Sequence, residues 1–150
     1  MKTEKYIISE GSGYDGLFNL FIVALYGVTM RYKIAYDFPF LQQKNLLHAH
    51  SHFAFSGWIS HFLYTALLPI IQPFLKKQQL KKYDLLLLAN LVCSFGMLIA
   101  FSIQGYKLVS ISFSIATIIV AVFYAYFFIS DSKKLPSGTV SKPWAIMGVL

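Results

Sequence analysis

Long apolar runs alternate with short polar stretches along this chain, and the alternation predicts its helices. Four of the runs have, or approach, the roughly 20 residues that a helix needs to cross a membrane. They predict spans at about residues 16–35, 46–70, 84–103 and 108–130. Residues 1–15 are polar and lack the apolar core of a signal peptide, so we expect a polar tail there.

Residues 143–150 extend the pattern by one more element. Pro143 and the apolar residues after it are typical of the first turns of a helix, but they are too few to cross a membrane. We therefore expect a single membrane domain over residues 1–150 that stops at the start of a truncated fifth helix, as a fragment would. A complete small protein is the alternative. The predicted fold class is an all-α, polytopic transmembrane helical bundle with four spans plus the start of a fifth.

Prolines, glycines and charges mark the connections between these spans. Pro39 predicts a loop between the first two spans, because proline disfavours helix at the residue before it. Asn45 is the predicted N-cap of the second span, and Pro69 and Pro73 are predicted to bend or end that span. Residues 76–82 predict a basic linker, and residues 104–107 predict a tight turn that makes the third and fourth spans an antiparallel hairpin.

The composition favours a membrane protein over the soluble classes. Apolar residues make up 57% of the chain and charged residues only 13%, whereas a soluble domain has about 25% charged residues. The mean hydropathy is +0.59. These values exclude a soluble globular domain, a disordered chain and a disulfide scaffold, and the single cysteine, Cys93, excludes an internal disulfide. We expect an integral membrane protein with the lipid bilayer as a partner.

The net charge of +7 comes mainly from residues at the edges of the apolar runs, so it indicates membrane topology and no nucleic-acid partner. Nine lysines fall in the tail, in residues 76–82 and in residues 131–142, all on one predicted side. Four basic residues fall on the other side: Arg31, Lys33, Lys44 and Lys107. Because cytoplasmic loops are enriched in lysine and arginine, we expect a cytoplasmic amino terminus, in a bacterial inner membrane.

All the histidines lie in the second predicted span: His48, His50, His52 and His61. Ionisable residues inside a membrane are costly and usually functional. On a regular helix His48 and His52 share one face, His50 points to the opposite side, and His61 returns to within roughly 20° of His50. The alternative interpretation is that these side chains only form hydrogen bonds with neighbouring helices or water.

Imidazoles in an apolar bundle are typical ligands of haem iron. The ring binds iron through one nitrogen, and the other N–H needs an acceptor that fixes the ring. His48 and His52 share a face and cannot occupy the two opposite axial positions of one iron, so this chain would supply one axial ligand. The Arg31 guanidinium lies near the same membrane boundary and could pair with haem propionates, although an interface anchor is its alternative role.

Residues 31–60, RYKIAYDFPFLQQKNLLHAHSHFAFSGWIS, resemble the first loop and second helix of the haem–copper oxidase subunit I-like family, which includes cytochrome oxidases and nitric oxide reductases. In that family the second helix opens on the outer side with a histidine that binds the low-spin haem. The resemblance implies a low-spin haem of b type in a cofactor site formed by His48, His50, His52 and Arg31. It implies His48 as the first choice for the iron ligand and His50 as the second.

The resemblance also implies what this chain lacks. The family's other haem and metal ligands lie on later helices, whereas this chain has no histidine after His61. We therefore expect part of an oxidoreductase that has no catalytic residue of its own. Copper or non-haem iron would lie only in the missing part, and the partners would be the remaining helices of the subunit or other respiratory subunits. The alternative is a small histidine-rich membrane protein that handles metal ions or haem in transport or assembly.

Overall fold

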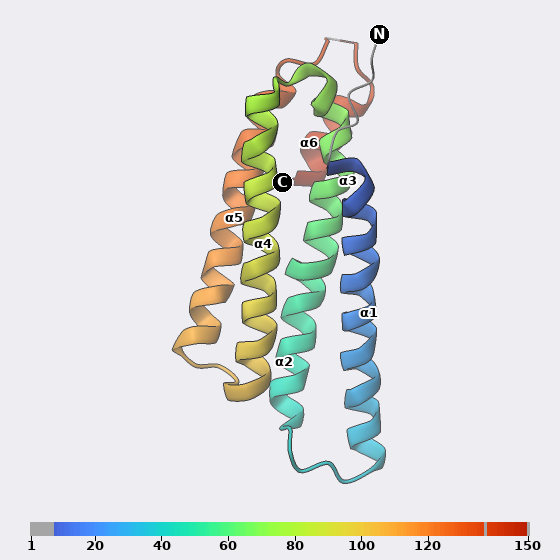
Figure 1. The fold of residues 1–150 in the computed structure, drawn as a ribbon, viewed down its shortest axis with the longest axis vertical. Coiled ribbons are helices and arrows are strands. Elements are labelled where there is room, and N and C mark those ends of the chain that lie inside the picture. Colours follow the sequence, from blue (N-terminus) through green and yellow to red (C-terminus); the bar gives the residue numbers. More distant parts are fainter. Residues whose placement is uncertain (1–7, 137, 150) are drawn as a thin grey trace.

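A computed structural model describes residues 8–136 and 138–149, and this part of the chain is helical and contains no strand. The helices are α1 (Ile8–Ala35), α2 (Gln43–Phe53), the π-helix η1 (Ala54–Ser60), α3 (His61–Ile71), the 3₁₀ helix η2 (Gln72–Phe74), α4 (Lys77–Gln104), α5 (Leu108–Ser132) and α6 (Ser141–Val149). The elements from α2 to η2 follow one another without a break, so they form one long rod (Figure 1).

Four helical segments are long and apolar enough to cross a membrane: Tyr14–Ala35, Gln43–Phe74, Lys77–Gln104 and Leu108–Ser132. They confirm the predicted all-α fold with four long apolar helices, and they fit an integral membrane protein. Large apolar side chains such as Leu85, Ile103 and Ile118 remain more than half exposed in the bundle. Such exposure is unfavourable in water and normal for side chains that face lipid.

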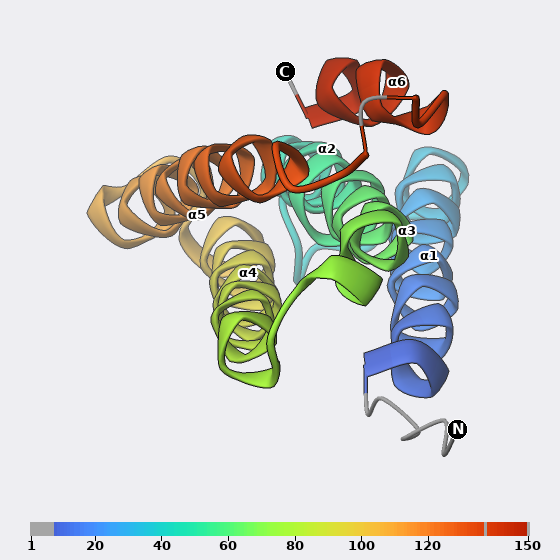
Figure 2. The same ribbon diagram turned by 90° about the horizontal axis from the view of Figure 1, so that it is seen from above.

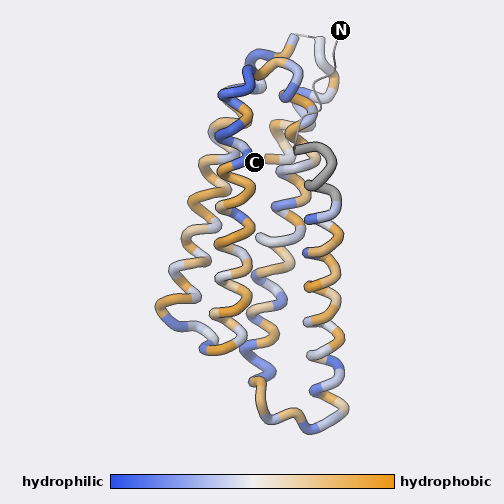
Figure 3. The backbone as a smooth tube through the Cα atoms, viewed as in Figure 1, coloured by the Kyte–Doolittle hydropathy of each residue, from blue (hydrophilic) through white to orange (hydrophobic). Residues whose placement is uncertain are grey.

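The rod from α2 to η2 occupies the centre of the bundle. Seen from above, α1 lies on one side of it and α4 and α5 lie on the other, while α6 packs against α3 and α5 (Figure 2). The chain reverses direction from each rod to the next, so α4 and α5 form the predicted antiparallel hairpin (Figure 1). Apolar residues dominate the middle of the bundle, and hydrophilic residues gather at its upper end (Figure 3).

Several helix boundaries differ from those predicted. α1 begins at Ile8, inside the predicted polar tail, and α4 begins at Lys77, inside the predicted basic linker. The N-cap of α2 is Gln42 rather than Asn45. Hydropathy locates the part of a helix that lies in lipid, whereas the helix itself continues past that part because water and headgroups solvate its polar turns.

The second span also continues past Pro69, which lies inside α3. A proline removes one backbone hydrogen bond without forcing the chain to leave the helix, because neighbouring helices support the local geometry in a membrane. The rod ends only at Phe74, directly after Pro73 in η2. Of the two prolines predicted to bend or end the span, Pro69 therefore lies within it and Pro73 lies at its end.

The tight turn between α4 and α5 depends on Gly105. Its φ is +63°, a conformation that side-chain-bearing residues rarely adopt. A Cβ at this position would also lie 2.5 Å from Oδ1 of Asn45, the residue predicted to cap α2. Asn45 therefore fits against the α4–α5 turn, and the glycine is required by both the backbone angle and this close approach.

Candidate functional site

A π-helical segment interrupts the second span between His52 and His61. In η1 the backbone N–H groups bond to carbonyls one residue further back along the chain than they would in an α-helix. Short π-helical segments of this kind occur frequently at functional sites. Two buried asparagines donate to carbonyls of this segment. Nδ2 of Asn19 in α1 lies 2.6 Å from the oxygen of Gly57, and Nδ2 of Asn90 in α4 lies 3.0 Å from the oxygen of Ser56. The amides of two flanking helices thus hold the irregular backbone from opposite sides.

Gly57 and Phe53 determine the shape of the same segment. Gly57 is buried, and a Cβ added to it would lie 2.5–2.9 Å from three ring atoms of Phe53. The Phe53 ring is fully buried and packs edge-on against Phe95 of α4, with the ring centroids 4.9 Å apart. The Phe53 ring can therefore lie across the π-helical turn because Gly57 has no side chain.

His48 and His52 share a face, as predicted, and this face packs on α4 and on the α4–α5 turn. The His52 ring is stacked on Phe101, with an interplanar angle of 8° and centroids 4.6 Å apart. Nε2 of His52 lies 2.8 Å from the hydroxyl of Tyr106, and the His48 ring meets the Tyr106 ring edge-on with centroids 4.5 Å apart. One nitrogen of His52 is thus already engaged in a hydrogen bond.

His50 points to the opposite side, also as predicted, and faces α1. A Cβ at Gly27 would lie 3.6 Å from Cε1 of His50, so the imidazole packs where α1 has no side chain. Nδ1 of His50 is buried and has no hydrogen-bond partner among the described residues. Arg31 lies one turn after Gly27 on the same face of α1, near the end of the helix, and its side chain is exposed.

That His61 shares the face of His50 stays a prediction, because the irregular helix η1 lies between the two residues. His61 is buried, and its Nδ1 lies 3.4 Å from Nδ2 of Asn90 in α4, whereas His50 faces α1. The prediction assumed a regular α-helix between the two residues. The π-helix between them turns by a smaller angle per residue, which changes the phase of every side chain that follows.

The described residues contain no group of three or more His, Cys, Asp or Glu side chains placed to hold a metal ion. A haem differs, because it can take one imidazole from this chain and its other axial ligand from elsewhere. Nδ1 of His50 is buried and has no hydrogen-bond partner among the described residues, and a buried polar atom normally has one. The histidines of this chain therefore fit the role of a single axial ligand.

Asn19 and Asn90 are the site residues that the sequence interpretation missed. Each is a strongly polar side chain inside an otherwise apolar run, and such residues in a membrane generally face another helix or a functional site. That signal was present in the sequence. Their shared target, the carbonyls of η1, was not visible there, because the partners are 38 and 34 residues away.

Comparison of the chain with protein-family models, with curated proteins and with solved structures finds no match. The likeness of residues 31–60 to the haem–copper oxidase family therefore remains an expectation from sequence.

Proposed function

We propose that this chain is the haem-binding amino-terminal part of a respiratory oxidase- or reductase-like membrane subunit. It would supply one axial imidazole to a low-spin haem, of b type by the family resemblance. The reduction of O2 or nitric oxide would take place elsewhere in the full protein. A bound haem would supply reversible one-electron transfer, while the residues of this chain would hold and orient it.

The observation that carries the proposal is the difference between the three histidines of α2. Nε2 of His52 is engaged with Tyr106 and its ring is stacked on Phe101, so it could offer only Nδ1 to a metal, whereas no side-chain hydrogen bond holds His48 or His50 among the described residues. Of these two, His50 has a buried nitrogen without a partner among the described residues, and a buried polar group in this state is costly. The geometry therefore favours His50 over His48, the reverse of the order that the resemblance implies.

Gly27 and Arg31 support the assignment to His50. Gly27 lets the His50 imidazole pack close to the α1 backbone, and small residues in a membrane helix allow such a close approach. Arg31 follows one turn later on the same face and can offer its guanidinium to a carboxylate at the membrane boundary. An imidazole and a guanidinium on one side of α1 and α2 match the iron and the propionates of a haem.

The test uses alanine variants in the full-length reading frame, purified in detergent and examined by visible absorption and electron paramagnetic resonance. His50→Ala is expected to lose the low-spin bis-imidazole signature. His52→Ala, a matched change in the same helix, is expected to keep it. If His48→Ala loses the signature instead, the ligand assignment is wrong and the haem proposal stands. If the unmodified protein has no Soret band, the proposed function itself is wrong.

The second candidate function is the handling of metal ions, and the paired face of α2 favours it. His48 and His52 lie one turn apart, and the hydroxyl of Tyr106 is 2.8 Å from His52. Two imidazoles and a phenol can bind Zn²⁺ or Cu²⁺ when another ligand completes the site. Titration of the haem-free protein with Zn²⁺, followed by calorimetry, separates the two functions. Tight binding that His52→Ala abolishes would favour metal handling.

A further inference from the structure

One end of the bundle gathers lysines from three separate segments. They are Lys76, Lys77, Lys81 and Lys82 around the start of α4, Lys133 and Lys134 after α5, and Lys142 in α6. The antiparallel packing brings the start of α4, the end of α5 and the start of α6 to the same upper end (Figures 1 and 3). We call these seven lysines the basic end.

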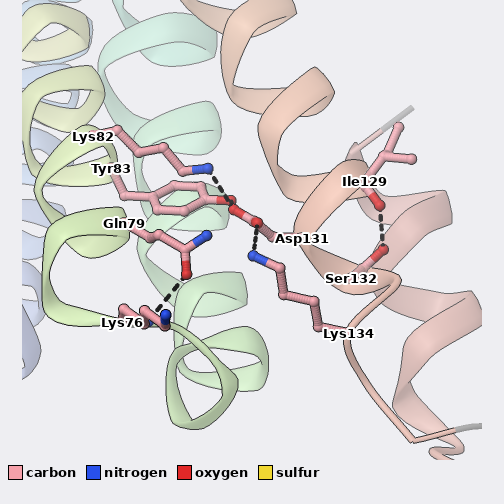
Figure 4. A network of polar contacts seen from close by, with 8 residues as sticks. All are labelled: Lys76, Gln79, Lys82, Tyr83, Ile129, Asp131, Ser132 and Lys134. Carbon is pink, nitrogen blue, oxygen red and sulfur yellow. Dashed lines mark hydrogen bonds and ion pairs between the residues drawn. The ribbon is translucent and has the colours of Figure 1, made fainter.

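Asp131 determines which of these lysines are engaged within the protein. Its carboxylate is buried and accepts Nζ of Lys82 at 2.6 Å, Nζ of Lys134 at 2.7 Å and the hydroxyl of Tyr83 at 2.8 Å (Figure 4). This carboxylate ties α4 to α5 and neutralises part of the charge. The only other acid on these three segments, Asp84, lies at an exposed position within α4.

The remaining lysines of the basic end point outward. Lys76, Lys77, Lys81 and Lys133 are exposed, and Lys142 is half-buried. The N-termini of α4 and α6 lie at the same end, and a helix N-terminus adds partial positive charge that favours anions. Among the described residues the opposite end carries four basic residues, two in the last turns of α1, one in the first turn of α2 and one before α5, together with Asp37. The charge is therefore concentrated at one end of the bundle.

Two exposed aromatic side chains place this end at the depth of the lipid headgroups. Phe74 in η2 is 45% exposed and Trp144 in α6 is 76% exposed, and both lie within a few residues of the lysines. Exposed aromatic residues are enriched where a membrane meets water, and tryptophan most clearly so. Trp144 therefore predicts that the ammonium groups near it lie at the depth of the lipid phosphates.

We propose that the basic end binds the phosphate groups of anionic phospholipids in the leaflet that it faces. The exposed lysines would form charge-assisted hydrogen bonds with these phosphates. Each lysine close to an anionic leaflet contributes roughly a fivefold preference over a neutral one. Lys82 and Lys134 contribute less, because Asp131 already holds them. This interaction does not depend on haem, so it stands or falls separately from the proposed function.

The experiment compares two matched double variants of the full chain. Lys77→Gln/Lys133→Gln removes two exposed lysines from the basic end, and Lys44→Gln/Lys107→Gln removes two exposed lysines from the opposite end. Each protein is reconstituted in vesicles of equimolar phosphatidylglycerol and phosphatidylcholine. The lipid that stays bound after detergent extraction is then counted by native mass spectrometry, and circular dichroism checks that each variant is helical.

We expect Lys77→Gln/Lys133→Gln to lower the ratio of bound phosphatidylglycerol to phosphatidylcholine by about 25-fold, fivefold for each lysine. Lys44→Gln/Lys107→Gln should change it by less than twofold. Equal ratios in the wild type and both variants, or an equal fall in both variants, would overturn the proposal. A further arm adds inorganic phosphate at millimolar concentration. If phosphate ions displace the bound anionic lipid completely, the basic end is a site for free phosphate and the lipid assignment is wrong.

Discussion

Gly57→Ala tests the close fit between the π-helix and the Phe53 ring. The added methyl group would lie within 3 Å of three ring atoms, and Phe53 is fully buried and has little room to move. Overpacking of this kind costs about 1–3 kcal/mol, and the severity of the contact places Gly57 near the upper limit. Alanine returns up to about 1 kcal/mol through its higher helix propensity. The expected net loss in the free energy of unfolding is about 2 kcal/mol.

The assay is equilibrium unfolding in mixed detergent micelles, followed by far-UV circular dichroism. Gly148→Ala is the matched control, because a Cβ there meets Leu67 at an ordinary 4.0 Å. It should leave the stability unchanged or raise it slightly. Adding Phe53→Leu to Gly57→Ala should recover part of the loss, since the two positions are in contact and their effects are not additive. If Gly57→Ala is as stable as Gly148→Ala, the reasoning about this contact is refuted.

Other changes test the remaining contacts. Asn19→Leu should lower the free energy of unfolding by about 1–2 kcal/mol in the same assay, because it leaves the buried carbonyl of Gly57 without its donor. A variant as stable as the wild type would mean that the Asn19 amide does not hold the π-helix. Asp131→Asn should cost about 1–3 kcal/mol, because the carboxylate serves three donors. Lys134→Gln should cost less than about 1 kcal/mol, since that lysine is 42% exposed; equal losses would contradict the central place of Asp131. A fluorescent-protein fusion after Lys82 should fluoresce in the cytoplasm, and alkaline phosphatase activity at the same position would reverse the proposed orientation.

The candidate site was predicted in part. The spacing of His48 and His52 placed both on one face, and His50 on the other, because all three lie in a regular helix before η1. The same spacing rule does not extend to His61, since the intervening π-helix changes the angle between residues. No local signal marked that segment. The carbonyls of this π-helix accept hydrogen bonds from Asn19 and Asn90, which belong to other helices.

Local patterns in the sequence were enough to predict the fold class, the number of long apolar helices, the α4–α5 hairpin and the concentration of histidines in one span. These features follow from hydropathy, helical periodicity and turn residues, all of which act between neighbours in the chain. The packing of the helices sets which imidazole is engaged, which lysines Asp131 holds and where the helix becomes a π-helix. Each of these depends on donors and acceptors that are distant in sequence and meet only when the helices pack, because a membrane interior leaves buried polar groups no partner except one another.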